Sequence, residues 1–331
     1  MPERMQRLSV SKLPTSYLNM TLAETIYELS AEHCRSGGLI MGQNLEAVQN
    51  VCGTVPIDDP NVQIMPTCEG AGIGMAVGAA LTGRPVIHVI RFASFLWMQA
   101  APIVYYAARA KSQWGYDLPL FIRVSSDDGI GPTHSGVYHS PFIHMPGLKV
   151  VAPMTPCEYR EVWQEFQESR QPVLVSEHRR SYENALEMPP YANAVKPSIL
   201  IIAISAARFD AIDALKILDQ HGIGAELYSI WRLNLDPVDI LELYAKTRGK
   251  LGVLIVDSGY APCSIAESIA FRLQSMCVLG NRPEFKVLGM KEPPGVCENG
   301  SPSAQEIADA AIEMWRQTSR RIAEQFMKAY Q

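Results

Sequence analysis

The segment Met65–Ala80 constrains this chain most, because a lone acid stands directly before a run of small residues. Glu69 is followed by four glycines, at positions 70, 72, 74 and 78. Because glycine has no side chain, such a surface lets a flat ligand or a second helix approach the backbone closely. A carboxylate beside that surface loses part of its water, which makes its proton affinity adjustable. We therefore expect Glu69 to have a specific partner.

Composition narrows the class of protein. The chain has 331 residues, of which 47% are apolar and 19% are charged, which is enough for about two globular domains. The low charge content favours a surface that is buried against another subunit. The net charge of −5 argues against a protein that binds nucleic acid. No apolar stretch reaches the ~18 residues of a membrane span, so we expect no membrane association and a cytoplasmic location.

Cysteine usage is typical of a reducing compartment. The seven cysteines are odd in number, and no two of them have the CxxC spacing of zinc ligands. We therefore expect neither a disulfide scaffold nor a bound metal in this chain.

Apolar strands alternate with amphipathic helices along most of the chain. Residues 1–19 lack this pattern and are interpreted as an N-terminal arm, whereas the alternation fills residues 20–185 and again 198–331. Between these two parts, residues 186–197 contain three prolines and little periodicity, which is typical of a linker. Such alternation predicts α/β domains in which helices cover both faces of a parallel sheet, so we expect two doubly wound domains.

Local signals locate several helices. Thr21-Leu-Ala-Glu24 and Ser303-Ala-Gln-Glu306 are capping boxes, in which a hydroxyl and an acid cap a helix start reciprocally. Between them we expect one continuous helix from Phe95 to Lys111.

A dinucleotide-binding loop is the first explanation for the glycines, and their spacing argues against it. The GxGxxG pattern requires a third glycine three positions after the second, but position 75 is Met and position 77 is Val. The run also follows an acid and not an apolar strand. Helix-on-helix packing at a subunit interface explains the glycines and is compatible with a functional Glu69.

Two further signals lie downstream. The polar loop Gly131-Pro-Thr-His134-Ser-Gly136 follows an apolar strand, where α/β sheets place their ligands, although a lone loop histidine is more often a solvated surface residue. His139 and His144 follow at intervals of five, which does not suit a zinc pair. Phe92 and Phe95 follow another strand. They are either core residues or a wall on which a heteroaromatic ligand stacks.

The order of these motifs resembles one known family. The acid before a small-residue helix, the aromatic pair, the GPTH loop and the segment from His144 to Pro153 (HMPGLKVVAP) are similar to the β subunit of thiamine-diphosphate-dependent E1 components of 2-oxo acid dehydrogenases. More broadly, they resemble transketolase-type enzymes. The resemblance runs from about Met20 to the last helix. It implies a transketolase-like pyrimidine-binding domain followed by a transketolase C-terminal-like domain.

The resemblance also implies roles for single residues. Glu69 matches the acid that bonds the aminopyrimidine ring nitrogen of thiamine diphosphate and so activates the cofactor. Phe95 matches the aromatic residue that stacks on the pyrimidine, with Phe92 as second choice. His134 matches the active-site histidine that hydrogen-bonds or protonates an oxygen of the substrate. A carboxyl group shielded by glycines and an apolar ring can share a proton with a weakly basic nitrogen, so the physical chemistry agrees.

The family binds the diphosphate end of the cofactor through a Gly-Asp-Gly segment and a downstream Asn that hold Mg²⁺. Gly-Asp-Gly is absent here, and Asp127-Asp128-Gly129 lies in the wrong loop. The chain therefore looks like half of an active site. We expect a separate α subunit to supply the Mg²⁺-binding half, in an α2β2 assembly, and a lipoyl or acyl-carrier protein as a possible acceptor.

Several positions depart from the family pattern. The usual Gly-Glu-Asp-Val is Gly42-Gln-Asn-Leu45, an Asp-Gln pair is replaced by Ala101-Pro102, and a Gln by Gly136. These changes point away from ordinary pyruvate or branched-chain substrates. The Arg typical of transketolase after the Pro172 strand is replaced by Glu177, and a sugar-phosphate donor requires such cations.

The sequence thus favours a β-type subunit that decarboxylates a 2-oxo acid and transfers the acyl unit. One alternative is a split transketolase-like subunit that transfers a two-carbon ketol unit. It is distinguished by its donor, which would be a ketose phosphate. The other alternative is a non-catalytic scaffold subunit, against which the presence of Glu69, Phe95 and His134 argues.

Overall fold

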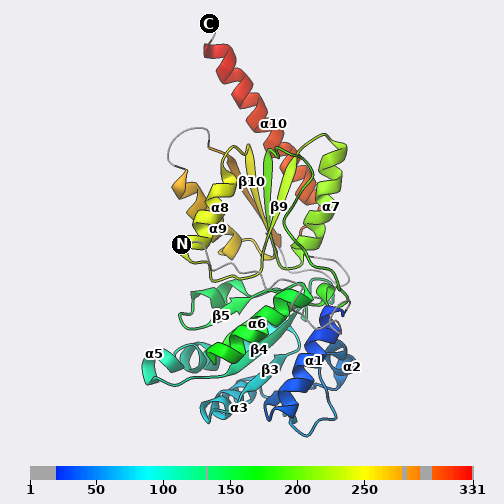
Figure 1. Ribbon diagram of the computed structural model, residues 1–331, viewed down its shortest axis with the longest axis vertical. Coiled ribbons are helices and arrows are strands. Elements are labelled where there is room, and N and C mark those ends of the chain that lie inside the picture. The colour runs from blue at the N-terminus through cyan, green and yellow to red at the C-terminus, as the bar shows by residue number, and fades with distance from the viewer. Residues whose placement is uncertain (1–19, 132, 278–281, 291–299, 330–331) are drawn as a thin grey trace.

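The computed structural model describes residues 20–131, 133–277, 282–290 and 300–329. The predicted arm 1–19 lies outside these ranges. Each of two sheets forms the centre of one α/β unit, and the two units lie one above the other along the long axis of the molecule (Figure 1). The predicted α/β class with two doubly wound units is confirmed.

The first sheet has six parallel strands in the order β2-β1-β3-β4-β6-β5. Most of its residues are apolar and many are β-branched, as expected for strands that are covered on both faces. In chain order the strands are β1 (Leu39–Gln43), β2 (Val62–Met65), β3 (Val86–Ile90), β4 (Leu120–Ser126), β5 (Lys149–Val151) and β6 (Val173–His178). The register pairs Gly42 with Val89 and Ile90 with Val124, so the carboxyl ends of β1, β3 and β4 lie at the same end of the sheet.

Helices cover both faces of this sheet. On one face, α1 (Leu22–Arg35) and α6 (Pro156–Ser169) pack against alternate strand residues such as Ile87 and Phe121. On the other, α3 (Glu69–Leu81) and α4 (Leu96–Pro102) pack against Val86, Ile90 and their neighbours. The capping box that begins α1 is confirmed, because the Thr21 hydroxyl accepts from the Glu24 N–H and the Glu24 carboxylate accepts from the Thr21 N–H.

The single helix expected from Phe95 to Lys111 is wrong in detail, because the segment breaks into short pieces. A 3-10 turn, η3 (Ala93–Phe95), leads into α4, and a π-helical turn, η4 (Ile103–Ala107), separates α4 from α5 (Ala110–Trp114). Pro102 ends α4, since proline has no N–H to donate and its ring crowds the preceding turn. Gly115 then adopts a left-handed conformation with φ of 73° and ends α5.

An unusual turn follows β1. In α2 (Ala47–Gly53), five consecutive residues from Val48 to Cys52 have left-handed φ angles between 51° and 56°. The left-handed conformation costs each non-glycine residue about 1–2 kcal/mol of free energy, so contacts with neighbouring segments must hold the turn. One contact comes from Arg123 of β4, whose Nη2 donates to the Thr54 hydroxyl over 2.8 Å.

The second sheet has five strands in the order β11-β10-β8-β9-β7. Its strands are β7 (Tyr191–Ala192), β8 (Ile199–Ile204), β9 (Ala225–Ile230), β10 (Gly252–Tyr260) and β11 (Glu284–Met290). All pair in parallel except β7, which lies within the segment interpreted as a linker and pairs antiparallel with β9. Helices α7 (Ala207–Gln220) and α10 (Ala304–Ala329) cover one face, and α8 (Pro237–Thr247) and α9 (Ile265–Met276) the other. The end of α10 projects beyond the body (Figure 1).

Three short 3-10 turns complete the described elements: η3, η5 (Ser140–His144) and η6 (Arg179–Ser181). No helix of the described ranges combines the length and the apolar character that crossing a membrane requires.

Buried polar contacts and apolar packing join the two units. Arg208 of α7 forms a bidentate pair with Glu158 of α6, with N–O distances of 2.7 and 2.9 Å. His139 lies 2.9 Å from a carboxylate oxygen of Asp257, and both side chains are fully buried. One apolar cluster also runs through both units without a break. The second unit therefore holds the segment between β4 and β5 in place.

A buried ion pair lies in the centre of the first sheet. The Arg123 guanidinium on β4 binds the Glu177 carboxylate on β6 through contacts of 2.8 and 3.0 Å, and both side chains are at most 1% exposed. The hydroxyls of Tyr159 and Tyr182 donate to the same carboxylate over 2.6 and 2.9 Å. Burial raises the pKa of both tyrosine hydroxyls, so they remain donors. Glu177 is therefore a structural residue that satisfies a buried cation.

We expect Glu177→Gln to destabilise the fold by about 3–5 kcal/mol, because the substitution leaves a buried guanidinium without its counter-charge. Urea unfolding monitored by circular dichroism measures this loss. The exposed Glu168 of α6 is a matched control, since Glu168→Gln should change the free energy of unfolding by less than about 0.5 kcal/mol. Equal effects of the two substitutions would contradict the structural role of Glu177.

Candidate active site

The aligned carboxyl ends of β1, β3 and β4 surround a cavity of about 370 Å³. Gln43 ends β1, Arg91 and Phe92 follow β3, and the loop after β4 brings His134 to the same place. The cavity walls consist of Gln43, Asn44, His88, Val89, Ile90, Arg91, Phe92, Phe95, Gln99 and His134. Three of the four residues singled out in the sequence, Phe92, Phe95 and His134, thus line one cavity. The fourth, Glu69, lies next to it.

Gln43 connects Glu69 to the cavity. With its amide oxygen turned toward α3, Gln43 accepts hydrogen bonds from the N–H groups of Cys68 and Glu69, at 3.2 and 3.1 Å. The Glu69 N–H is one of the donors that a helix start leaves free, and no side-chain cap from Cys68 satisfies it. The Cys68 N–H also donates to the carbonyl oxygen of Pro66 over 2.7 Å. The half-buried Glu69 is therefore fixed at the positive end of α3, where a carboxylate is favoured. Gln43 is one of the positions that depart from the family pattern, and it fixes the first turn of α3, on which Glu69 lies.

Aromatic contacts organise the opposite wall. The rings of Phe92 and Phe95 meet edge to face with centroids 5.9 Å apart, and the His134 ring lies 4.4 Å from Phe92 and 6.0 Å from Phe95. The Ser94 hydroxyl donates to the carbonyl oxygen of Thr133 over 2.8 Å, which ties the aromatic turn to the histidine loop. The sequence predicted each of these residues separately, and the structure brings them into contact.

The chain's own packing does not explain the glycines of α3. A Cβ atom built at Gly74 or Gly78 would meet nothing within 4 Å, and one at Gly70 would meet only a carbonyl oxygen at 3.8 Å. These three glycines are exposed and spaced by four residues, so they form one smooth strip along the helix. Since each glycine costs about 1 kcal/mol of helix stability relative to alanine, the strip calls for a function outside this chain's core.

Comparison with known proteins agrees with this geometry. Residues 43–184, which carry the cavity, match the family model described as "Transketolase, pyrimidine binding domain". The β subunit of 2-oxoisovalerate dehydrogenase from Bacillus subtilis strain 168 is 27% identical over 257 residues, covering 72% of this chain and 77% of that protein. The β subunit of the pyruvate dehydrogenase E1 component from Porphyra purpurea is 31% identical over 228 residues, covering 64% of this chain and 68% of that protein.

The chain belongs to the family of E1 β subunits.

This E1 β-type chain is also similar to a further relative and to a solved structure. The β subunit of acetoin:2,6-dichlorophenolindophenol oxidoreductase from Cupriavidus necator is 29% identical, covering 62% of this chain and 64% of that protein. A split-gene transketolase, solved as an inactive β4 tetramer, superposes with a TM-score of 0.69 at 16% identity. It covers 89% of this chain and 98% of its own. At that identity the superposition supports the fold alone.

Among the wall residues that sequence reasoning missed, His88 and Gln99 form a buried polar pair. His88 on β3 is 2% exposed, and its Nε2 lies 2.7 Å from the amide oxygen of Gln99, which is 4% exposed on α4. An amide oxygen only accepts, so Nε2 donates and Nδ1 is a bare acceptor, which is buried without a partner in the described part of the chain. Burial lowers the pKa of His88 to about 4, so the imidazole is neutral. A histidine inside the apolar strand Pro85-Val-Ile-His-Val-Ile90 was the available signal.

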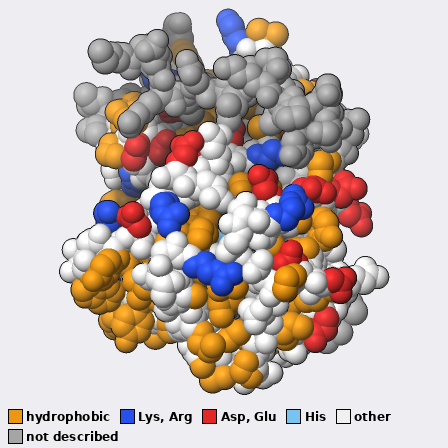
Figure 2. Space-filling model, turned by 60° about the horizontal axis from the view of Figure 1, so that its bottom comes forward, with side chains coloured by type: hydrophobic (Ala, Val, Ile, Leu, Met, Phe, Trp, Pro, Cys, Tyr) orange, Lys and Arg blue, Asp and Glu red, His pale blue; other side chains and the backbone are white. Residues whose placement is uncertain are grey.

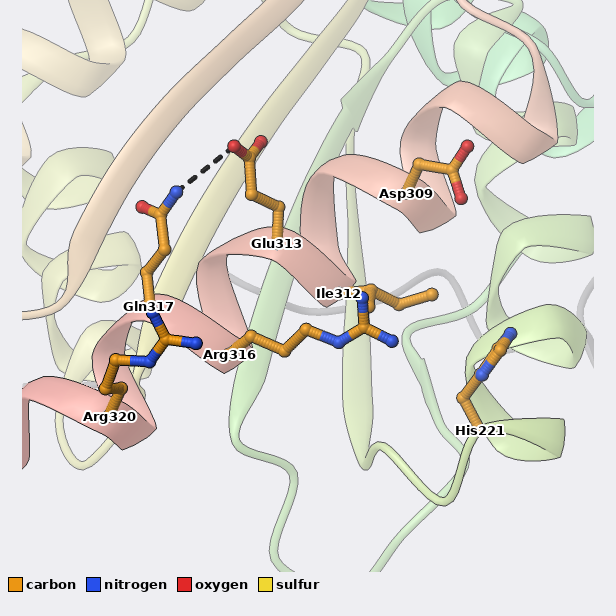
Figure 3. A pocket seen from close by; sticks show the side chains of 7 residues that line it. All are labelled: His221, Asp309, Ile312, Glu313, Arg316, Gln317 and Arg320. Carbon is orange, nitrogen blue, oxygen red and sulfur yellow. Dashed lines mark hydrogen bonds between the residues drawn. The ribbon is translucent and has the colours of Figure 1, made fainter. Parts of the chain in front are cut away.

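A larger hollow of about 460 Å³ lies on the second unit, remote from these residues. It is lined by His221, which follows α7, and by one side of α10: Asp309, Ile312, Glu313, Arg316, Gln317 and Arg320 (Figure 3). Its charged groups are exposed, and Glu313 is occupied by Lys286 and Gln317, at 2.6 and 3.1 Å. The hollow lacks the aromatic walls and the buried acceptor of the first cavity.

The buried neutral His88 makes stability depend on pH. Its pKa is about 4 in the folded state and about 6.5 when exposed, so the unfolded state binds the extra proton and stability falls as the pH drops from 6.5 toward 4. We expect the wild type to lose on the order of 2 kcal/mol more than His88→Gln between pH 7 and pH 5. Urea unfolding at the two pH values measures the difference. The exposed His221 is the control, since His221→Gln should keep the wild-type pH dependence.

Proposed function

We propose that this chain is the β-type subunit of a heteromeric thiamine-diphosphate enzyme that decarboxylates a 2-oxo acid and transfers the acyl unit. The observation that carries the proposal is the single cavity at the ends of β1, β3 and β4. Beside this cavity an acid, an aromatic pair and a histidine come together. The names of the relatives support it, because those proteins are β subunits of pyruvate and 2-oxoisovalerate dehydrogenases.

The residues present fit the aminopyrimidine end of the cofactor. Such a ring offers a weakly basic nitrogen to Glu69, an apolar face to Phe95 or Phe92, and an amino group as donor. The unpaired Nδ1 of His88 is a buried acceptor in the cavity wall and complements a donor of this kind. When bound, thiamine diphosphate supplies the nucleophilic carbon that attacks the 2-oxo group.

Each of the site residues then has a defined role. Glu69 holds a proton on the ring nitrogen, and Gln43 keeps the helix start that carries Glu69 fixed. Phe95, or Phe92 in its place, orients the ring. His134 donates a hydrogen bond to the oxygen of the substrate carbonyl, and its contacts with both phenylalanines exclude water from that side. Fixed positions of this kind are how a protein tunes a cofactor.

The diphosphate end requires a partner. Among the described residues, no cluster of three or more His, Cys, Asp or Glu side chains suits a metal ion. Asp127 accepts from the Gly129 N–H over 2.9 Å and faces Arg179, while the buried Asp128 faces His178 and Arg180. Both acids are thus turned to internal contacts. We therefore place the Mg²⁺ on an α subunit. We further propose that the two kinds of subunit form an α2β2 assembly in the cytoplasm, and that a lipoyl or acyl-carrier protein is a possible acceptor of the acyl unit.

The surface around α3 suits such a partner. Exposed apolar side chains accompany the glycine strip along the chain from α3 to Tyr116, just after α5, and Figure 2 shows hydrophobic side chains gathered on this end of the molecule. Those exposed by more than 40% are Met75, Leu81, Trp97, Met98, Tyr105, Tyr106, Trp114 and Tyr116. Large exposed apolar areas of this kind mark interaction sites. A cavity beside such an area is completed when the partner binds.

We expect Glu69→Gln to abolish activation of the cofactor while leaving the fold nearly unchanged, because the amide cannot share a proton with the ring nitrogen. Hydrogen–deuterium exchange at the thiazolium C2, followed by NMR in the complex with the α partner, measures activation directly. Glu28→Gln replaces an exposed acid on α1 and serves as the control. Wild-type exchange in Glu69→Gln, with bound cofactor verified, would remove Glu69 from the proposed role.

His134→Ala should lower kcat by roughly 10²–10⁴-fold and change the affinity for thiamine diphosphate only a few-fold, since His134 acts on the substrate oxygen. Steady-state kinetics and calorimetric titration of the complex separate the two quantities. The exposed His144 lies in the same loop region, and His144→Ala should leave both near the wild-type values. A large loss of cofactor affinity at unchanged kcat would instead make His134 a cofactor-binding residue.

A further inference from the structure

An arginine that lies directly after β3 lines the cavity. Arg91 forms part of the wall together with Phe92 and His134. Its guanidinium carbon lies 5.1 Å from the centre of the Phe92 ring. Its Nε is buried without a hydrogen-bond partner, and no carboxylate of the described residues forms an ion pair with it. A cavity wall thus carries a positive charge that no described carboxylate neutralises through an ion pair.

A second arginine approaches the same ring from another element. Arg179 begins η6 after β6, and its guanidinium carbon lies 4.7 Å from the Phe92 centroid. Its Nη2 donates to the carbonyl oxygen of Arg91 over 3.0 Å, and its Nε is also buried without a partner in the described part. The nearest carboxylate paired with it is Asp127, at 3.9 Å. Phe92 therefore has two guanidinium groups packed around it.

This arrangement is electrostatically incomplete. Burial lowers the pKa of Arg91, and the like charge of Arg179 lowers it further, while the Cys52 thiol and Glu46 act in the opposite direction without pairing. Two partly desolvated cations packed against one ring cost free energy unless an anion joins them. The guanidinium fork is the side chain best suited to hold a carboxylate or a phosphate.

The reacting carboxylate is the wrong anion for this place. A cation that binds it stabilises the ground state, whereas decarboxylation turns that charged group into neutral CO₂, so the interaction weakens in the transition state. A charge at the far end of the substrate does not change during the reaction, and its binding energy positions the reacting carbon.

We propose that Arg91 and Arg179 bind an anionic group, carboxylate or phosphate, at the end of the donor substrate remote from its reacting carbonyl carbon. The inference rests on the proposed function and adds a substrate class to it. It also explains why the sequence suggested no cation here. Glu177 stands on β6 where transketolase typically has an arginine. The two guanidinium groups come instead from Arg179, two residues later, and from Arg91, directly after β3.

The first test compares pairs of donors that differ only in the remote charge. With the complex of this chain and its α partner, we expect kcat/KM for 2-oxopentanedioate to exceed that for 2-oxopentanoate by at least ten-fold if the remote group is a carboxylate. If it is a phosphate, the same preference should appear for D-xylulose 5-phosphate over D-xylulose. Absence of both preferences overturns the proposal.

Substitutions assign the preference to the arginines. Arg91→Met should remove most of it, mainly through a higher KM for the charged donor. Arg91→Lys should keep part of it. Arg320→Met removes an exposed cation of α10 (Figure 3) and should leave the ratio unchanged. Unfolding midpoints of all variants identify loss of fold, and an unchanged ratio in folded Arg91→Met contradicts the assignment.

A binding experiment separates this proposal from the proposed function. Phenylglyoxal modifies arginines, and peptide mass spectrometry measures its rate at Arg91 and Arg179 in the same complex. Pentanedioate, or inorganic phosphate, should protect these two sites at least three-fold more than pentanoate at equal ionic strength, with Arg320 unaffected. Protection without turnover of any 2-oxo acid refutes the proposed reaction and retains the anion site. Turnover without protection refutes the anion site alone.

Discussion

The parallel pairing of β1, β3 and β4 is the constraint on which the candidate site depends. Because the register aligns Gly42 with Val89 and Ile90 with Val124, three segments that are far apart in sequence leave the sheet at one edge. Each then contributes one kind of group: an amide from Gln43, a cation and two rings from residues 91–95, and an imidazole from His134. A shift of any strand by one residue would turn its last side chain to the opposite face.

The first sheet holds paired charges in its interior and incompletely paired charges near the carboxyl ends of its strands. In its interior, Arg123 and Glu177 are paired at 2.8 Å, and hydroxyl donors occupy the remaining carboxylate positions, so the pair is satisfied and inert. Near the carboxyl ends of its strands, the guanidinium groups of Arg91 and Arg179 lie close to one ring, and Nδ1 of His88 has no partner among the described residues. Unsatisfied buried groups cost stability, and a bound ligand offsets that cost where it supplies the missing partner. The contrast separates the part of the sheet that holds the fold from the part where we propose that a ligand binds.

The second unit completes this arrangement from the other side. It does so through contacts with the chain between β4 and β5, which carries His134. His139 meets Asp257, the Ser140 hydroxyl accepts from the Ile265 N–H over 3.1 Å, and the Gly300 N–H donates to the Asp128 carbonyl over 3.0 Å. A loop of this length would otherwise be mobile. The exposed glycine strip of α3 and the apolar side chains that accompany it form the surface on which we propose that a partner subunit closes the cavity.

The sequence by itself determined the class of the fold, the helix start at Thr21 and the identity of Glu69, Phe92, Phe95 and His134 as the residues to examine. These follow from local signals: alternation, capping patterns and the order of motifs along the chain. The left-handed turn after β1 was not predicted, because it depends on contacts with neighbouring segments such as the one from Arg123. The break of the helix at Pro102 was also missed, although the proline itself was a local signal for it. Only the tertiary structure decided that Gln43 anchors Glu69, that His88 is a neutral acceptor in the cavity wall, and that Arg91 and Arg179 share one ring. Those facts arise from strand order and burial. Both are properties of contacts between distant segments, and no single stretch of sequence contains them.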